Sequence, residues 1–199
     1  MAPAPGRWNA LKAKKEAALN RPRPQRRRDE EALAARGITR MVKWFEKRGF
    51  NVSFGPRLND EVFLQLRMVT IRSRSSLRSQ LISLLHEAGH ILLEERPSYD
   101  ERFGVGWNLV ARKNDKRKMT AAHRVQVLEE EIEAWNRGKG LSGRLRISVD
   151  EKLWNRIRYR CISSYSHYAS QKQHPIRVPV AQPPRTLISP ARGLVGSAR

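Results

Sequence analysis

The chain has 199 residues, and its 40 Lys and Arg against 19 Asp and Glu give a formal net charge of +21. This length suffices for one ordinary domain with extensions, and the charge predicts attraction to polyanions such as nucleic acid, or to an acidic partner. No apolar run is long enough to cross a membrane and no apolar signal core begins the chain, so we expect an intracellular, cytoplasmic protein without a membrane partner. The single cysteine, Cys161, excludes an internal disulfide and a zinc site built from several cysteines.

Proline and basic charge concentrate near both ends of the chain, which predicts three regions. Residues 1–39 form a basic, Pro/Arg-rich N-terminal extension, 40–170 form one domain, and 171–199 form a basic, Pro-rich C-terminal tail. Residues 1–28 and the C-terminal tail are expected to be disordered, because they combine few apolar residues with much charge. The tails contain almost no aromatic residues for base stacking, so contacts to phosphate with little sequence readout are expected.

Two short helices are expected at the start of the domain. Asp29 can cap a helix through Leu33, and Thr39 can cap a second helix that stops at Gly49. Apolar residues recur on one face of the second helix, so this face should contact the core.

Two strands and a helix follow. Residues 50–54 favour a short strand, and residues 61–72 alternate apolar and polar side chains as one strand, with a bulge near Val69. Ser75 or Ser76 then caps a helix through Leu93. The sequence thus predicts a small sheet followed by a long apolar helix.

The second half of the domain is predicted to be helical after a charged loop at 94–120. A helix is expected over 121–137, ending at Gly138, and a last helix begins after Asp150 as its cap. One face of the last helix is apolar at helical spacing, and its members are Leu153, Ile157, Cys161, Tyr165 and Tyr168.

The chemistry-bearing motif is His86-Glu87-Ala-Gly-His90, within an apolar helix. Histidines at i and i+4 share one helix face, so both imidazoles can reach one metal ion. The adjacent glutamate lies over the same site, where it can accept a proton from a catalytic water. Two histidines inside an apolar helix also need a partner, because unpaired polar groups are costly to bury.

A zinc site of this type needs a third protein ligand. One class places a glycine three residues after the second histidine and a further histidine three beyond, but Leu93 and Arg96 stand there, which excludes it. The other class takes a carboxylate from a later helix. Residues 128–135, LEEEIEAW, offer four glutamates.

Helix geometry separates these four glutamates. At about 100° per residue, Glu131 falls inside an apolar arc around Leu128, whereas Glu129 and Glu133 fall at its edge or outside it. Glu130 falls on the opposite side, where a solvated acidic face is the simpler interpretation. A buried acid needs a partner, so Glu131 is the expected third ligand and Glu133 the alternative.

From about residue 50 to 137 the chain resembles the gluzincin metallopeptidases, and among them the ImmA/IrrE-type proteins. The likeness rests on a strand, a Ser-rich turn, LISLLHEAGHILL, a loop and EIEAW, in which Glu131 and Ala134 match the family's Glu-x-x-Ala and Trp135 stands where the family has asparagine. The resemblance implies an α+β, zincin-like metallopeptidase core with a small twisted sheet, an active-site helix and a later ligand helix. It also implies that His86, His90 and Glu131 bind Zn²⁺ and that Glu87 is the general base.

The resemblance further implies a protein or peptide substrate that pairs with the strand at 61–72, and an additional donor for the oxyanion. Tyr99 and His123 are candidates for this donor by position, although an ordinary surface role is the simpler interpretation of both. Manganese or iron would use similar ligands.

Three functions are compatible with the sequence. The first is a zinc endopeptidase that its basic tails, together with Arg72, Arg74 and Arg78, steer to nucleic acid or an acidic partner. The second is a non-catalytic nucleic-acid-binding or virion-type structural protein on a zincin scaffold, since proteins of this size with basic tails resemble ones carried by bacteriophages; it would lie in the host cytoplasm or in the virion. The third is a regulator that binds a protein through the groove without cutting it.

Overall fold

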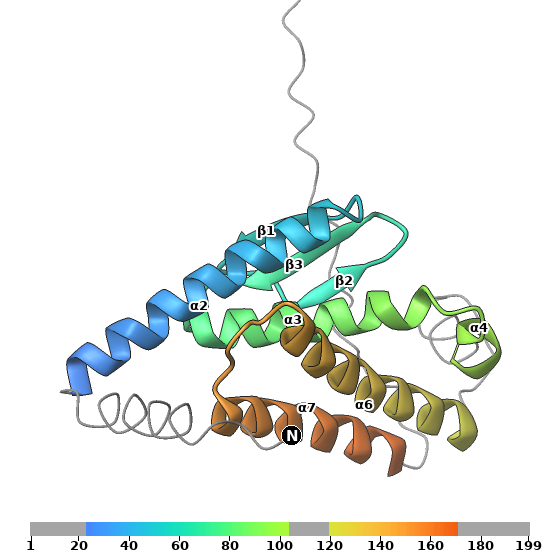
Figure 1. Cartoon of the computed structure of the whole chain (residues 1–199). Coiled ribbons are helices and arrows are strands. Elements are labelled where there is room, and N and C mark those ends of the chain that lie inside the picture. The colour runs from blue at the N-terminus through green and yellow to red at the C-terminus, as the bar shows by residue number, and fades with distance from the viewer. Residues whose placement is uncertain (1–22, 104–119, 171–199) are drawn as a thin grey trace, which may run out of the picture.

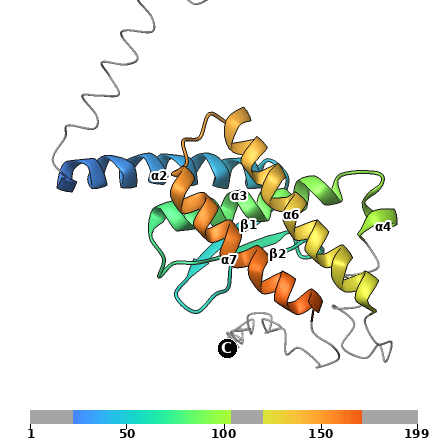
Figure 2. The ribbon, with the colours of Figure 1, turned by 90° about the horizontal axis from the view of Figure 1, so that it is seen from below.

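The computed structural model describes residues 23–103 and 120–170, and this part of the chain has an α+β fold, as the sequence predicts. A three-stranded sheet lies on one side of the central helix α3, and α6 and α7 lie on the other (Figure 1). Figure 2, seen from below, shows α6 and α7 crossing in front of α3. The elements are α2 (Arg23–Glu46), β1 (Asn51–Gly55), β2 (Glu61–Phe63), β3 (Met68–Arg72), α3 (Leu77–Glu94), α4 (Tyr99–Arg102), α6 (Ala121–Arg144) and α7 (Glu151–Ser170).

Helix α2 is one continuous helix, so the prediction of two short helices is wrong. Thr39 does not cap a helix; its Oγ1 donates to the carbonyl of Ala35 one turn earlier, within α2. The helix crosses the boundary predicted after residue 39, and buried Ala34 packs in the core. Its first turns include residues 23–28, which were expected to be disordered. Gly49, with φ +75°, follows the helix end as predicted.

The sheet has the order β1-β3-β2, with β1 parallel and β2 antiparallel to β3. The expected single strand at 61–72 is therefore a hairpin. The change of phase near Val69 is not a bulge: it reflects the turn at 64–67, in which Arg67 has φ 48°. Because β3 is central, β1 and β2 are the two edge strands of the sheet within the described residues.

Helix α3 forms as predicted and is buried along most of its length. Ser76 caps it, since its side chain accepts a hydrogen bond from the N–H of Ser79. The helix contacts α2, β2, β3 and α6, which explains why apolar residues occur on all its sides. Its motif residues therefore lie inside the molecule.

Helix α6 does not end at Gly138 but continues to Arg144. Gly138 is instead a point of close approach: a Cβ there would lie 2.2 Å from the carbonyl oxygen of Leu85 on α3. Gly89 on α3 is the reciprocal point, because its Cβ would lie 2.0 Å from the carbonyl oxygen of Ala134 on α6. The two glycines let the helix backbones touch at the height of the histidine motif.

Helix α7 begins after Asp150 as predicted, with the Asp150 carboxylate accepting from the N–H of Leu153. Trp154 packs edge-on against Trp135 of α6, with ring centroids 5.1 Å apart. Ile157 and Cys161 follow on the same inward face, packed against the core. None of the described helices combines the length and the apolarity that a membrane crossing needs.

Candidate metal centre

The two histidines of the motif lie one above the other on the side of α3 that faces α6. His86 and His90 are both 8% exposed, and their ring centroids are 4.8 Å apart. Glu87, between them in sequence, is 5% exposed. The spacing of four residues thus places both imidazoles on one face of α3, as the sequence predicts, and all three side chains are buried.

Glu131 of α6 faces both imidazoles. Its Oε2 lies 3.3 Å from Nε2 of His86 and its Oε1 lies 3.6 Å from Nε2 of His90. The alternative, Glu133, is turned outward and pairs with Arg137, whose Nη2 is 2.8 Å from its Oε1. The structure therefore brings together the histidines and the glutamate that the helical wheel selects.

Glu130 is buried, against the expectation of a solvated position. It is 2% exposed, its Oε1 lies 3.4 Å from Nδ1 of His90, and Tyr99 donates to the same oxygen at 2.9 Å. The predicted position of Glu130 is wrong because the prediction centres the buried face of this helix on Leu128. Val125 belongs to that predicted face, yet it is 46% exposed. The observed buried stripe of α6 is displaced by about a quarter turn, and its members are Val127, Glu130, Glu131, Ala134, Trp135, Gly138, Leu141 and Ser142.

Trp135 contacts His86 through its ring. The two rings stack with centroids 4.3 Å apart and an interplanar angle of 19°. Within the described residues, Nδ1 of His86 is buried without a hydrogen-bond partner. The stacked indole thus restricts the plane of this imidazole.

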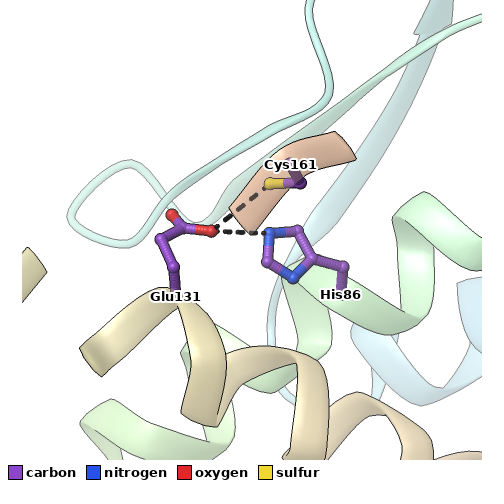
Figure 3. A group of neighbouring side chains, drawn as sticks. All are labelled: His86, Glu131 and Cys161. Carbon is purple, nitrogen blue, oxygen red and sulfur yellow. Dashed lines mark hydrogen bonds and ion pairs between the residues drawn. The ribbon is translucent and has the colours of Figure 1, made fainter. Parts of the chain in front are cut away.

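Cys161 reaches the same centre from α7, although the sequence analysis predicts only a core position for it. Its Sγ is 3.8 Å from Oε2 of Glu131 (Figure 3). The ligand atoms of His86, Glu131 and Cys161 lie within 4.8 Å of one another, and His90 is not part of this compact group. The hydroxyl of Tyr165, one turn further along α7, is close enough to Glu131 to help lower the pKa of its carboxyl group. The sequence feature that could have identified Cys161 and Tyr165 is their position on the apolar face of the last helix.

The carboxylates respond to this enclosure in opposite ways. Burial alone would raise the pKa of Glu131, but His90, His86 and the Tyr165 hydroxyl outweigh it and lower that pKa to about 2. Burial raises the pKa of Glu87 to about 8, opposed by His90 and assisted by Glu131, Asp60 and Glu61. Glu131 is thus held as an anion.

Burial and the charge of Glu131 also shift the pKa values of the histidine, thiol and phenol groups at this centre. Burial would lower the pKa of His90, yet Glu131 and the hydrogen-bonded Glu130 raise it. Burial, followed by the charge of Glu131, raises the pKa of the Cys161 thiol to about 12. The pKa of Tyr165 is raised for the same two reasons. The anionic charge of the centre therefore lies on Glu131, opposite the Nε2 atoms of both histidines.

Neither sequence candidate for an oxyanion donor is free for that role. The Tyr99 hydroxyl is committed to Glu130. His123 lies at the start of α6, where it forms a capping box with Thr120: its N–H donates to Oγ1 of Thr120, and its Nδ1 accepts from the N–H of Thr120, both at 3.3 Å. His123 has the ordinary helix-terminal role that was the simpler interpretation.

Arg72 and Arg78 both make polar contacts with other segments of the described fold. Nη1 of Arg78 lies 2.7 Å from Oε2 of Glu30 and 3.3 Å from Oδ2 of Asp150, so Arg78 connects α2, α3 and the start of α7. Arg72 donates to the carbonyl of Leu58 and to the side chain of Asn59. Arg72 and Arg74 are both exposed, whereas Arg78 is partly buried by its ion pairs, so only Arg72 and Arg74 present their charge openly at this surface.

The donor set fits a divalent cation such as zinc. Imidazole nitrogens and a carboxylate oxygen are common zinc ligands, and a thiol is another. In the described part of the chain, the ion pairs of Glu130 and Glu131 are with the two histidines alone, so a bound cation would neutralise buried negative charge. No protein-family model, curated protein or solved structure matches this chain.

Proposed function

We propose that this chain is a zinc-dependent metallopeptidase that hydrolyses peptide bonds in a protein or peptide substrate. The observation that supports it best is the meeting of both Nε2 atoms of the histidine motif with one buried carboxylate, that of Glu131, from another helix. His86, His90 and Glu131 would hold the metal ion. Two histidines and one carboxylate are a ligand set of catalytic zinc sites, which leave a fourth position for water or substrate.

The contact of Glu130 with Nδ1 of His90 supports this assignment. A carboxylate that accepts from the Nδ1 side of an imidazole fixes the tautomer whose Nε2 carries a lone pair. The 3.4 Å approach of Glu130 to Nδ1 of His90 is compatible with that role, and the Tyr99 hydroxyl holds the carboxylate in place. The chain thus contains both a ligand and the group that orients it.

Glu87 is the proposed general base. When bound, the metal ion supplies Lewis-acid polarisation of the scissile carbonyl and the attacking water. Glu87 takes one proton from that water as the water oxygen adds to the carbonyl carbon. The Glu87 carboxyl then returns the proton to the amide nitrogen as the C–N bond breaks, which releases a carboxylic acid and an amine.

The edge strand β2 is the proposed docking site for an extended substrate. In the described part of the chain it is an edge strand of the sheet, it contacts α3, and Glu61 at its start is close enough to affect the pKa of Glu87. An extended peptide added to such an edge forms main-chain hydrogen bonds that do not depend on its sequence. This replaces the expectation that the whole segment 61–72 is the substrate-binding strand.

The test is the Glu87→Gln variant of the full chain, with Glu94→Gln, an exposed position at the end of α3, as the matched control. Metal analysis should find stoichiometric zinc in both variants. Cleavage of a fluorescence-quenched random peptide library should fall at least about 100-fold in Glu87→Gln only. His86→Ala should lose the zinc. Cleavage retained in Glu87→Gln would refute the proposed role of Glu87.

The second candidate is a non-catalytic nucleic-acid-binding protein on the same scaffold. The observation in its favour is the run Arg26–Arg28 at the exposed start of α2, in a chain of net charge +21. It predicts tight, salt-sensitive binding to duplex DNA with equal affinity in Glu87→Gln, and no peptide cleavage. Fluorescence anisotropy over a salt series measures the first property and the peptide library the second.

A further inference from the structure

The proposed peptidase leaves one group of the centre without a role, the thiol of Cys161. Helix α7 delivers its Sγ to 3.8 Å from Oε2 of Glu131, the same oxygen that lies 3.3 Å from Nε2 of His86. Figure 3 shows the three side chains converging from three helices. All three donor atoms lie within 4.8 Å of one another, a separation that one metal ion can bridge after small shifts.

A second observation at this centre is a buried donor without a partner in the described part of the chain. The indole N–H of Trp135 is buried without a hydrogen-bond partner among the described residues, and Trp135 is 2% exposed. The Trp135 ring stacks on His86, and its indole interacts with the Cys161 side chain. Such a donor can hydrogen-bond a metal-bound sulfur atom, which stabilises the sulfur as a ligand.

We propose that Cys161 is a fourth protein ligand of the metal, which closes the site in the resting chain. The inference rests on the proposed function only in that it places the same ion on His86, His90 and Glu131. The thiol loses its proton to solvent when the ion binds, as cysteine ligands do. A thiolate also selects zinc over manganese, which carboxylates and water would favour.

A metal ion held by four protein ligands has a consequence for activity. A site with four protein ligands has no position left for water, which is the arrangement of structural zinc sites. Cleavage by the wild-type chain is therefore slowed rather than abolished, because it proceeds only in the fraction of molecules in which Cys161 has left the ion. Removing the thiol opens the fourth position without touching the three ligands or Glu87.

The experiment compares the wild-type chain with Cys161→Ser, which keeps the size of the side chain, and with Ser163→Ala, an exposed position on α7. Each protein is loaded with Co²⁺ for absorption spectra and with Zn²⁺ for alkylation by N-ethylmaleimide. Because Cys161 is the one cysteine of the chain, a single added label in the intact mass reports on it alone.

We expect a thiolate-to-cobalt charge-transfer band in the wild type and in Ser163→Ala, and none in Cys161→Ser. Zinc should slow alkylation of the wild type at least about 10-fold, and chelation or His86→Ala should remove the protection. Zinc affinity should fall at least about 10-fold in Cys161→Ser, as expected for the loss of a ligand. Its peptide cleavage should rise above that of the wild type.

The outcomes separate the two proposals. Stoichiometric zinc with an unprotected thiol and no charge-transfer band would overturn the ligand role of Cys161 and leave the peptidase standing. A protected thiol and a charge-transfer band, with no cleavage in either the wild type or Cys161→Ser, would overturn the peptidase and leave the ligand assignment standing. A wild-type chain that binds no zinc would overturn both.

Discussion

Gly89→Ala should destabilise this protein far more than a helical glycine-to-alanine change normally does. In a helix this change ordinarily gains about 0.5–1 kcal/mol, because alanine loses less backbone entropy on folding. At Gly89 the new Cβ would lie 2.0 Å from the carbonyl oxygen of Ala134, and at Gly138 it would lie 2.2 Å from that of Leu85. Both obstacles are backbone atoms, so relief requires the helices α3 and α6 to separate.

The separation needed is large for a packed interface. Moving the Ala134 oxygen to ordinary contact distance takes a shift of about 1 Å or more, and such overpacking costs about 3 kcal/mol. For a domain of this size that lowers the melting temperature by about 6–12 °C. The same shift would move Glu131 away from Nε2 of His86, so zinc affinity should fall at least about 10-fold.

Gly140→Ala is the matched control on α6. Its Cβ would lie 3.6 Å from Nη1 of Arg144, an ordinary contact, so this variant should gain about 0.5–1 kcal/mol. Thermal denaturation followed by circular dichroism measures stability, and competition with a chromophoric chelator measures zinc affinity. If Gly89→Ala and Gly138→Ala were as stable as Gly140→Ala, the close contact of α3 with α6 would be refuted.

Two further predictions concern groups that the sequence placed elsewhere. Glu130→Gln should weaken zinc binding about 10–100-fold, because an amide orients His90 less well than a carboxylate does. The control Glu129→Gln, at an exposed position, should bind zinc as the wild type does. Equal zinc affinities of the two variants would contradict the proposed contact of Glu130 with Nδ1 of His90. Arg78→Ala should cost about 1 kcal/mol in urea denaturation at low salt and less at high salt, since the Arg78 side chain is partly exposed and its ion pairs are screened. Arg74→Ala should change the stability by less than about 0.5 kcal/mol, and a salt-independent cost at Arg78 would mean that its packing matters more than its charge.

The helical elements of the centre could be predicted from local signals. Ser76 as cap, the apolar flanks of the motif and Asp150 as cap located α3 and the start of α7. Histidines four residues apart share a face in any α-helix, so their pairing needed no tertiary information. Glu131 was found because an acid among apolar residues on one helix face calls for a buried partner.

Other elements depended on contacts between distant segments. Gly138 has the local signature of a helix end, yet the backbone of α3 determines its role, and no local pattern encodes that approach. The alternation of apolar and polar residues over 61–72 predicts one strand with a bulge, whereas the structure has a turn there. Alternation shows which side chains face the core, but it does not show a reversal of chain direction. Glu130 was misplaced because the exposed Val125 shifted the wheel.

The sequence by itself determined the chemistry that this protein has available: two imidazoles and a carboxylate on one face of an apolar helix, within a strongly basic chain. Helical periodicity also selected Glu131 as their partner, and only the tertiary structure decided that Cys161 joins them. Glu131 comes from α6 and Cys161 from α7, 30 residues apart in the chain and 3.8 Å apart in space. Periodicity defines the face of each helix, but the crossing of three helices sets which faces meet, and that crossing depends on packing across the whole core.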